Sequence, residues 1–201
     1  MHLGARDPIL KLFISVIGIT MPRILGLSGS LRQASFNTAL LNACKDLMPE
    51  GSTLDARTLH GVPLYDGDLE AAEGVPPAVQ ALKDALEQAD GLLLVTPEYN
   101  NGIPGVFKNA IDWMSREPKG TALFKGKPVA VIGASPSNFG TAHAQSAWLP
   151  VLRTLQTKPW FEGRLMVSRA QSVIEDGKLT DEKTRERLAD FLAGFSQSIG
   201  G

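Results

Sequence analysis

Residues 23–41 read RILGLSGSLRQASFNTALL, an apolar run followed by a polar turn and the start of a helix. Arg23–Leu27 has the composition of a buried strand, and Ser28-Gly29-Ser30 is typical of a turn. The apolar spacing after the turn predicts one buried helix face, formed by Leu40, Leu41, Cys44, Leu47 and Met48. A buried strand that leads directly into an amphipathic helix is the unit from which parallel sheets are built.

The same alternation continues to the end of the chain. Further strands are expected at residues 53–59, 92–95, 128–133 and 165–167. Helices are expected after Pro76-Pro77, after Pro104-Gly105, over residues 142–155 with a break or kink at Pro150, and after a Thr180 cap. These elements predict an α/β protein with three layers, a five-stranded parallel sheet covered by helices on both faces. Ligands of such folds bind at the carboxyl ends of the strands, where the strand order reverses.

Residues 1–20 do not continue this pattern. They contain an apolar run over residues 9–20, which is shorter than the roughly 20 residues needed to cross a bilayer. We expect the domain to span residues 21–201, with residues 1–20 as an extension or an upstream start outside the fold. A signal peptide or membrane anchor is the alternative, although no A-x-A-like cleavage site follows the run.

The composition excludes several classes of protein. The chain has 201 residues and a net charge of −1, which fits one domain with no general attraction to nucleic acid or to an anionic membrane. One cysteine excludes a disulfide framework within the chain and favours a cytoplasmic location. One cysteine and three histidines at scattered positions do not form the ligand set of a zinc site, so we expect no bound metal.

The loop after the first strand has the chemistry of a phosphate site. Ser30, Ser35 and Thr38 offer hydroxyls, Asn37 offers an amide, and Arg32 offers a guanidinium. The N–H groups at the start of the following helix attract anions as well. The G-x-G-x-x-G and P-loop patterns are absent, so a mononucleotide phosphate fits better than a dinucleotide or triphosphate. The alternative is that Ser35 or Asn37 only caps the helix and Arg32 is solvated.

The loop at residues 96–105, TPEYNNGIPG, has the chemistry to hold a flat ring. Tyr99 offers an aromatic surface, and Asn100 and Asn101 offer amides for the carbonyls of a heterocycle. The N–H groups near residues 99–102 are expected to be free for a ligand. An ordinary Asn-Gly turn explains the same residues equally well.

Two long segments together resemble the NAD(P)H-dependent FMN reductase family, which includes bacterial quinone and chromate reductases. These segments are GLSGSLRQASFNTALL at residues 26–41 and VTPEYNNGIPGVFKNAIDWMSR at residues 95–116. The resemblance runs from about Ile24 to the last helix, and includes Val62–Asp66 and Leu123–Pro128. It implies a flavodoxin-like fold, a bound FMN and NAD(P)H as co-substrate.

The resemblance also implies which residues bind FMN. The phosphate and ribityl chain would lie against Ser30, Leu31, Arg32, Gln33, Ser35, Phe36 and Asn37. The isoalloxazine would lie against Pro97, Glu98, Tyr99, Asn100 and Asn101, and Ser135 would add a further contact. Glu98 could instead meet a partner subunit. No residue of the chain is expected to act as a catalytic acid or base, because the flavin carries the redox chemistry.

Two departures from the family pattern concern the pocket wall and the assembly. Asn101 stands where many relatives have Tyr, and Ala144–Leu149 (AQSAWL) stands where relatives often read A-Q-Y-H-L-R. Because Tyr and Arg there contribute to tetramer contacts in relatives, a homodimer is expected here, with a tetramer possible.

The expected function is hydride transfer from NAD(P)H to bound FMN, followed by two-electron transfer to small acceptors. Quinones, free flavin, chromate and similar compounds are the candidate acceptors. The alternative is a flavodoxin-like electron carrier that binds FMN but has no NAD(P)H turnover of its own. Such carriers tend to be strongly acidic, which a net charge of −1 does not match. A flavin-free module on the same fold is a third reading.

Overall fold

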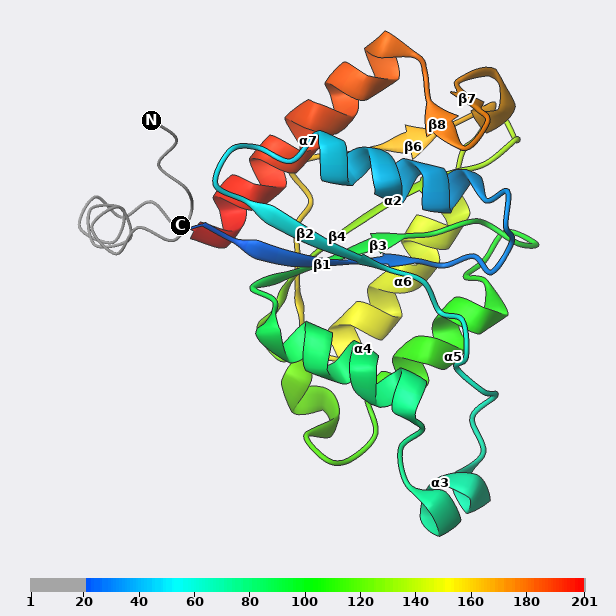
Figure 1. The fold of residues 1–201 in the computed structure, drawn as a ribbon, viewed down its shortest axis with the longest axis vertical. Helices are drawn as coiled ribbons and strands as arrows, with labels where there is room; N and C mark the ends of the chain where they lie inside the picture. Colours follow the sequence, from blue (N-terminus) through cyan, green and yellow to red (C-terminus); the bar gives the residue numbers. More distant parts are fainter. Residues whose placement is uncertain (1–20, 201) are drawn as a thin grey trace, which may run out of the picture.

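A parallel sheet forms the middle layer of the computed structural model, which describes residues 21–200 (Figure 1). Its strands are β1 (Arg23–Ser28), β2 (Thr53–Arg57), β3 (Gly91–Val95), β4 (Pro128–Ala134), β5 (Lys158–Pro159) and β6 (Met166–Val167). They are ordered β2-β1-β3-β4-β5, with β6 also paired to β4. This confirms the expected α/β class and the five-position parallel sheet; residues 1–20, expected to be an extension, lie outside the described residues.

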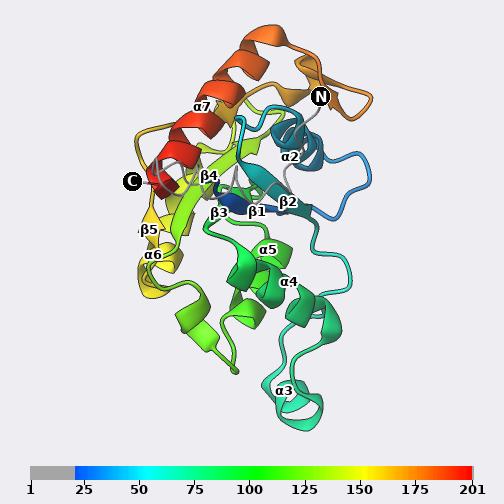
Figure 2. The same ribbon diagram turned by 60° about the vertical axis from the view of Figure 1, so that its left-hand side comes forward.

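Helices cover both faces of the sheet. The helices α2 (Phe36–Asp46) and α7 (Glu182–Gly200) lie on one face, and α4 (Pro77–Gln88), α5 (Gly105–Met114) and α6 (Ala142–Thr154) lie on the other (Figures 1 and 2). Neighbouring residues of β3 enter opposite cores: Leu93 packs with α2 and α7, and Leu94 packs with α4 and α5. Both cores consist mainly of buried aliphatic and aromatic side chains, which is why the central strands are continuously apolar.

The fifth sheet position differs from the expectation. One strand was expected at residues 165–167, but two short strands share this edge. β5 pairs with β4 at Pro128 and Val129, and β6 pairs with it at Gly133 and Ala134. Among residues 21–200, neither of these strand pairs includes Ala130, Val131 or Ile132 in the middle of β4.

Several smaller elements also differ. The helix α6 runs through Pro150 without a break, contrary to one of the expected outcomes. The last helix is capped by Asp181 and not by Thr180, because the Asp181 carboxylate accepts hydrogen bonds from the backbone N–H (2.8 Å) and the hydroxyl (2.6 Å) of Thr184. The second strand ends at Arg57, two residues early. The short helix α3 (Gly67–Glu73) and the hairpin of β7 (Ile174–Glu175) and β8 (Lys178–Leu179) were not expected.

The strand order reverses between β1 and β3. β1 lies between β2 and β3, so the chain leaves β1 toward one edge of the sheet and leaves β3 toward the other. The loops that follow these two strands therefore meet at the switch point, where open α/β sheets bind ligands.

Candidate functional site

The first loop runs from the end of β1 into α2 and presents polar groups around a helix N-terminus. The Ser35 hydroxyl caps α2 by accepting from the N–H of Thr38 (3.2 Å), and the Ser35 carbonyl accepts from Ala39. The N–H groups of Phe36 and Asn37 keep no partner among residues 21–200. The arrangement therefore combines unpaired helical N–H groups with the hydroxyl of Ser30, whose side chain is buried.

Arg32 projects from this loop into solvent. Its backbone N–H donates to the Ser30 hydroxyl (3.2 Å), which fixes the turn, while the residue itself is exposed. Among the residues that the structure describes, its guanidinium forms no ion pair. The Arg32 guanidinium, close to the N-terminus of α2, is therefore available to an anionic ligand.

Asn37 is placed differently from the other polar residues of the loop. Its side chain is buried, its Nδ2 donates to the carbonyl of Ala134 (2.8 Å), and its Oδ1 accepts from the N–H of Ala134 (2.9 Å). The side chain therefore reaches the end of β4, beneath the loop surface.

The second loop is a tight two-residue hairpin. Tyr99 and Gly102 exchange two backbone hydrogen bonds, at 3.2 and 3.1 Å, around Asn100 and Asn101. Both asparagines have positive φ angles, 51° and 61°, which their short polar side chains tolerate better than most residues. The expectation of free N–H groups at residues 99–102 is thus wrong at Tyr99 and Gly102, which bond to each other.

Glu98 connects this loop to α6. Its Oε2 accepts from the N–H groups of His143 (2.8 Å) and Ala144 (3.0 Å), which lie in the first turn of α6. The N-cap residue Thr141 forms no side-chain cap of its own, so Glu98 takes that role from another part of the chain. The carboxylate also lies at the positive end of the helix dipole.

The third loop follows β4 and begins with the buried Ser135. Its hydroxyl lies 3.2 Å from the Ser137 hydroxyl and accepts from the Ser137 N–H (3.1 Å). Arg169 holds the outer side of the loop, donating from its backbone N–H to the Ser137 carbonyl and from Nε to Asn138 (2.9 Å). The loop is therefore fixed to the segment after β6.

All three loops meet in one hollow at the carboxyl ends of the strands, which we call the three-loop hollow. It is lined by Ser30, Arg32, Ser35, Phe36, Asn37, Pro97, Glu98, Tyr99, Ala134, Ser135 and Pro136. Leu31, Gln33, Asn100 and Asn101 were expected at the site but do not line the hollow. Ala134 and Pro136 were not expected, and their apolar side chains carried no chemical signal in the sequence.

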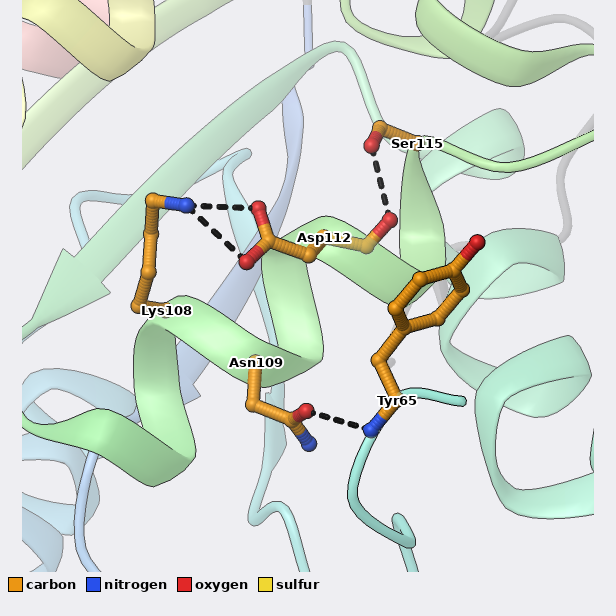
Figure 3. A network of polar contacts seen from close by, with 5 residues as sticks. All are labelled: Tyr65, Lys108, Asn109, Asp112 and Ser115. Atoms are coloured by element: carbon orange, nitrogen blue, oxygen red, sulfur yellow. Dashed lines mark hydrogen bonds and ion pairs between the residues drawn. The ribbon is translucent and has the colours of Figure 1, made fainter. Parts of the chain in front are cut away.

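A segment outside the hollow, Pro63–Tyr65, is fixed onto α5 by Asn109 (Figure 3). The Asn109 amide accepts from the Tyr65 N–H (2.8 Å) and donates to the Pro63 carbonyl (2.8 Å). The Tyr65 ring packs edge-on against Trp113, with ring centroids 4.9 Å apart. On the same helix, Lys108 pairs with Asp112 at 2.7 Å. This segment belongs to the wider sequence resemblance, and the structure gives it a packing role against α5.

Other titratable groups of the described residues do not form a second reactive centre. Burial raises the pKa of the Cys44 thiol far above its usual range, so this cysteine is not a nucleophile. His60 and His143 are exposed, and His60 bonds to the carbonyl of Leu31 (3.2 Å). Residues 21–200 contain no cluster of His, Cys, Asp or Glu able to hold a metal ion. No helix in this part of the chain has the length and apolar character to span a membrane.

Known proteins share both the sequence and the fold. The family model described as NADPH-dependent FMN reductase matches residues 22–172. An NAD(P)H-dependent FMN reductase of Pseudomonas aeruginosa is 44% identical over 171 residues, covering 85% of this chain and 91% of its own length. A quinone reductase of Escherichia coli K12 is 35% identical over 182 residues, covering 88% and 95%.

A solved structure agrees with these relatives. The flavoenzyme NAD(P)H:(acceptor) oxidoreductase FerB from Paracoccus denitrificans superposes with a TM-score of 0.75 at 37% identity. The match covers 89% of this chain and 97% of that protein. The family match, the relatives and the three loops at the switch point of a 2-1-3-4-5 sheet agree: this chain belongs to the NADPH-dependent FMN reductase family.

Proposed function

We propose that this protein is an FMN-containing oxidoreductase that uses NAD(P)H to reduce quinones, with free flavin, chromate and similar small acceptors as further candidates. The observation that carries the proposal is the three-loop hollow, in which a helix N-terminus, an exposed arginine and an exposed aromatic ring surround one space. The names of the relatives support the same class of reaction. With a quinone, the balanced reaction is NAD(P)H + H⁺ + quinone → NAD(P)⁺ + hydroquinone.

The residues at the hollow fit FMN. We propose that the N–H groups of Phe36 and Asn37, the hydroxyls of Ser30 and Ser35 and the guanidinium of Arg32 bind the phosphate. Phosphate oxygens accept strong hydrogen bonds from unpaired N–H groups at a helix N-terminus and from an arginine guanidinium. Leu31 and Gln33 belong to the same loop, and we propose that they contact FMN by their backbone.

The second and third loops are proposed to hold the ring system. Pro97, Glu98 and Tyr99 line the hollow, and Asn100 and Asn101 form the hairpin tip beside it. Ser135 of the third loop also lines the hollow, and we propose that its hydroxyl adds a further contact. FMN held there would supply the hydride and electron-transfer chemistry between NAD(P)H and the acceptor, and the role of these residues would be to bind and orient its ring system.

We also propose that the protein is a homodimer in the cytoplasm, with a tetramer as the alternative assembly. Large apolar side chains stand exposed on all three loops: Leu31 is 40% exposed, Tyr99 47% and Phe139 73%. Exposed apolar groups gathered around a site favour a protein partner. Light scattering of the purified protein should give the mass of two chains, and the mass of one chain would contradict the homodimer.

The test of activity is steady-state turnover. The purified protein, supplied with FMN, should oxidise NADH or NADPH when a quinone is present, with no other protein added. An electron carrier would bind FMN but show no such turnover. A colourless protein that takes up no FMN and oxidises neither nucleotide would overturn the proposal.

A further inference from the structure

The Asn37 side chain joins two loops of the site through one buried pair of hydrogen bonds. Asn37 lies in the first turn of α2, and Ala134 is the last residue of β4. The amide donates to the Ala134 carbonyl at 2.8 Å and accepts from the Ala134 N–H at 2.9 Å. Only 4% of Asn37 and 2% of Ala134 is exposed.

The end of β4 needs this partner because β3 stops earlier. The last register pair of these strands is Val95 with Ile132, and the Ile132 carbonyl accepts from the Thr96 N–H. Since alternate residues of a strand direct their backbone groups to the same side, Ala134 also faces the β3 side, beyond the end of β3. Buried backbone groups without a partner are costly, and the Asn37 amide takes the place of the missing strand.

Both ends of this link line the three-loop hollow, and so do their neighbours in the chain. Ser35 and Phe36 directly precede Asn37, and Ser135 directly follows Ala134. Ser135 is held on its other side by its N–H, which donates to the Val167 carbonyl (2.9 Å). The two hydrogen bonds of the Asn37 amide therefore fix the distance between the first loop and the third loop.

We infer that Asn37 is a positioning residue for FMN: its side chain braces the first loop against β4 and does not serve as a ligand of the phosphate. The inference rests on the proposed function, because it assumes that FMN binds in the three-loop hollow. It assigns the contribution of Asn37 to its backbone N–H and to the loop geometry. Any loss of the amide should then loosen both loops before any ligand is present.

The variant Asn37→Leu tests this positioning role, because leucine has a similar size but cannot form either hydrogen bond to Ala134. In the FMN-free variant, hydrogen exchange at the Ala134 N–H should be at least about tenfold faster than in the wild type, because that group loses the Asn37 Oδ1 as its acceptor. The FMN affinity, measured by quenching of flavin fluorescence, should fall at least about tenfold. Asn37→Ser removes the same bonds with a smaller side chain and replaces the leucine variant if that one does not fold.

Leu86→Ala is the matched control for loss of stability alone. Leu86 is fully buried in α4, outside the hollow, so its truncation should lower the melting temperature while FMN affinity stays within about twofold of the wild type. If Asn37 were a direct ligand, its variants would lose FMN affinity with unchanged exchange at Ala134, which would overturn the inference. Unchanged FMN affinity would overturn it as well. If the wild type bound no FMN, the proposed function would fail, whereas the exchange at Ala134 would still report on the brace.

Discussion

Arg32 is the charged side chain on the rim of the three-loop hollow, and it remains exposed and without an ion pair among residues 21–200. A hydrogen bond from a charged donor contributes about 1.5–3 kcal/mol. Arg32→Ala should therefore weaken FMN binding by about 10- to 100-fold in a fluorescence titration. Riboflavin, which has no phosphate, should bind the variant and the wild type equally.

Arg57→Ala supplies the control for this substitution. Arg57 is on β2, pairs with Asp55 at 2.9 Å and does not line the hollow. Its removal should leave FMN affinity unchanged. Equal losses in the Arg32 and Arg57 variants would mean that general charge, and not a phosphate contact, governs binding.

Gly29 follows β1 where Phe107 of α5 approaches the backbone. A Cβ at this position would lie 2.1 Å from Cδ1 of Phe107, closer than any stable contact. Gly29→Ala should lower the free energy of unfolding by about 1–3 kcal/mol because the buried ring must move, measured by urea denaturation. Gly105→Ala makes the same chemical change where nothing lies within 4 Å, and should shift stability by less than about 0.5 kcal/mol. Similar losses in both variants would contradict the steric argument.

At the scale of elements, α6 depends on a carboxylate from outside the helix. Glu98→Ala removes the acceptor of two N–H groups in its first turn, so we expect a loss of about 1–2 kcal/mol in unfolding free energy. Glu87→Ala, which breaks an exposed pair with Lys119, should lose less than about 0.5 kcal/mol. Unfolding of both variants at the same denaturant concentration would contradict the capping role of Glu98.

The cap of α7 gives a pH dependence whose direction follows from Asp181. Hydrogen bonds from the hydroxyl and the N–H of Thr184 lower the pKa of Asp181 below its ordinary value. The cap therefore stabilises the fold above the pKa of an unfolded aspartate, near 3.9, and its contribution is lost as pH falls through the lower folded pKa. Asp181→Ala should be less stable at pH 7, with the difference from the wild type shrinking toward pH 3 in urea melts. A difference that stayed constant would contradict this role.

The helices and strands could be predicted from the sequence where the spacing of apolar residues and the length of the segment indicated the same type of element. The central strand β3 lies where its apolar run predicts, because burial on both faces demands continuous apolar residues. In α2, Leu40, Leu41 and Cys44 are buried as their helical spacing predicts. β5 was missed because Lys158–Pro159 is two residues long and contains proline. Pro150 did not end α6, since Leu152 is fully buried beyond it and tertiary packing outweighs the lost hydrogen bond.

At the scale of the whole molecule, the sequence predicts which loops form the site, but it does not predict which side chains of those loops contact one another or the rest of the chain. The sequence indicated polar loops after β1 and β3, and the parallel topology brings them together. The side chains of Asn37 and Glu98 bond to Ala134 and to α6, partners 97 and 45 residues away in the chain. Pairings over such separations depend on where strands and helices end, which local patterns do not specify.

The central claim is that the three-loop hollow binds FMN through its phosphate. Its most direct test compares the affinities of the FMN-free protein for FMN and for riboflavin in one fluorescence titration. The donors around the α2 N-terminus predict that FMN binds at least about 100-fold more tightly, since a charged hydrogen bond and the helix N-terminus both act on the phosphate. Equal affinities for the two flavins, or binding of neither, would contradict the account.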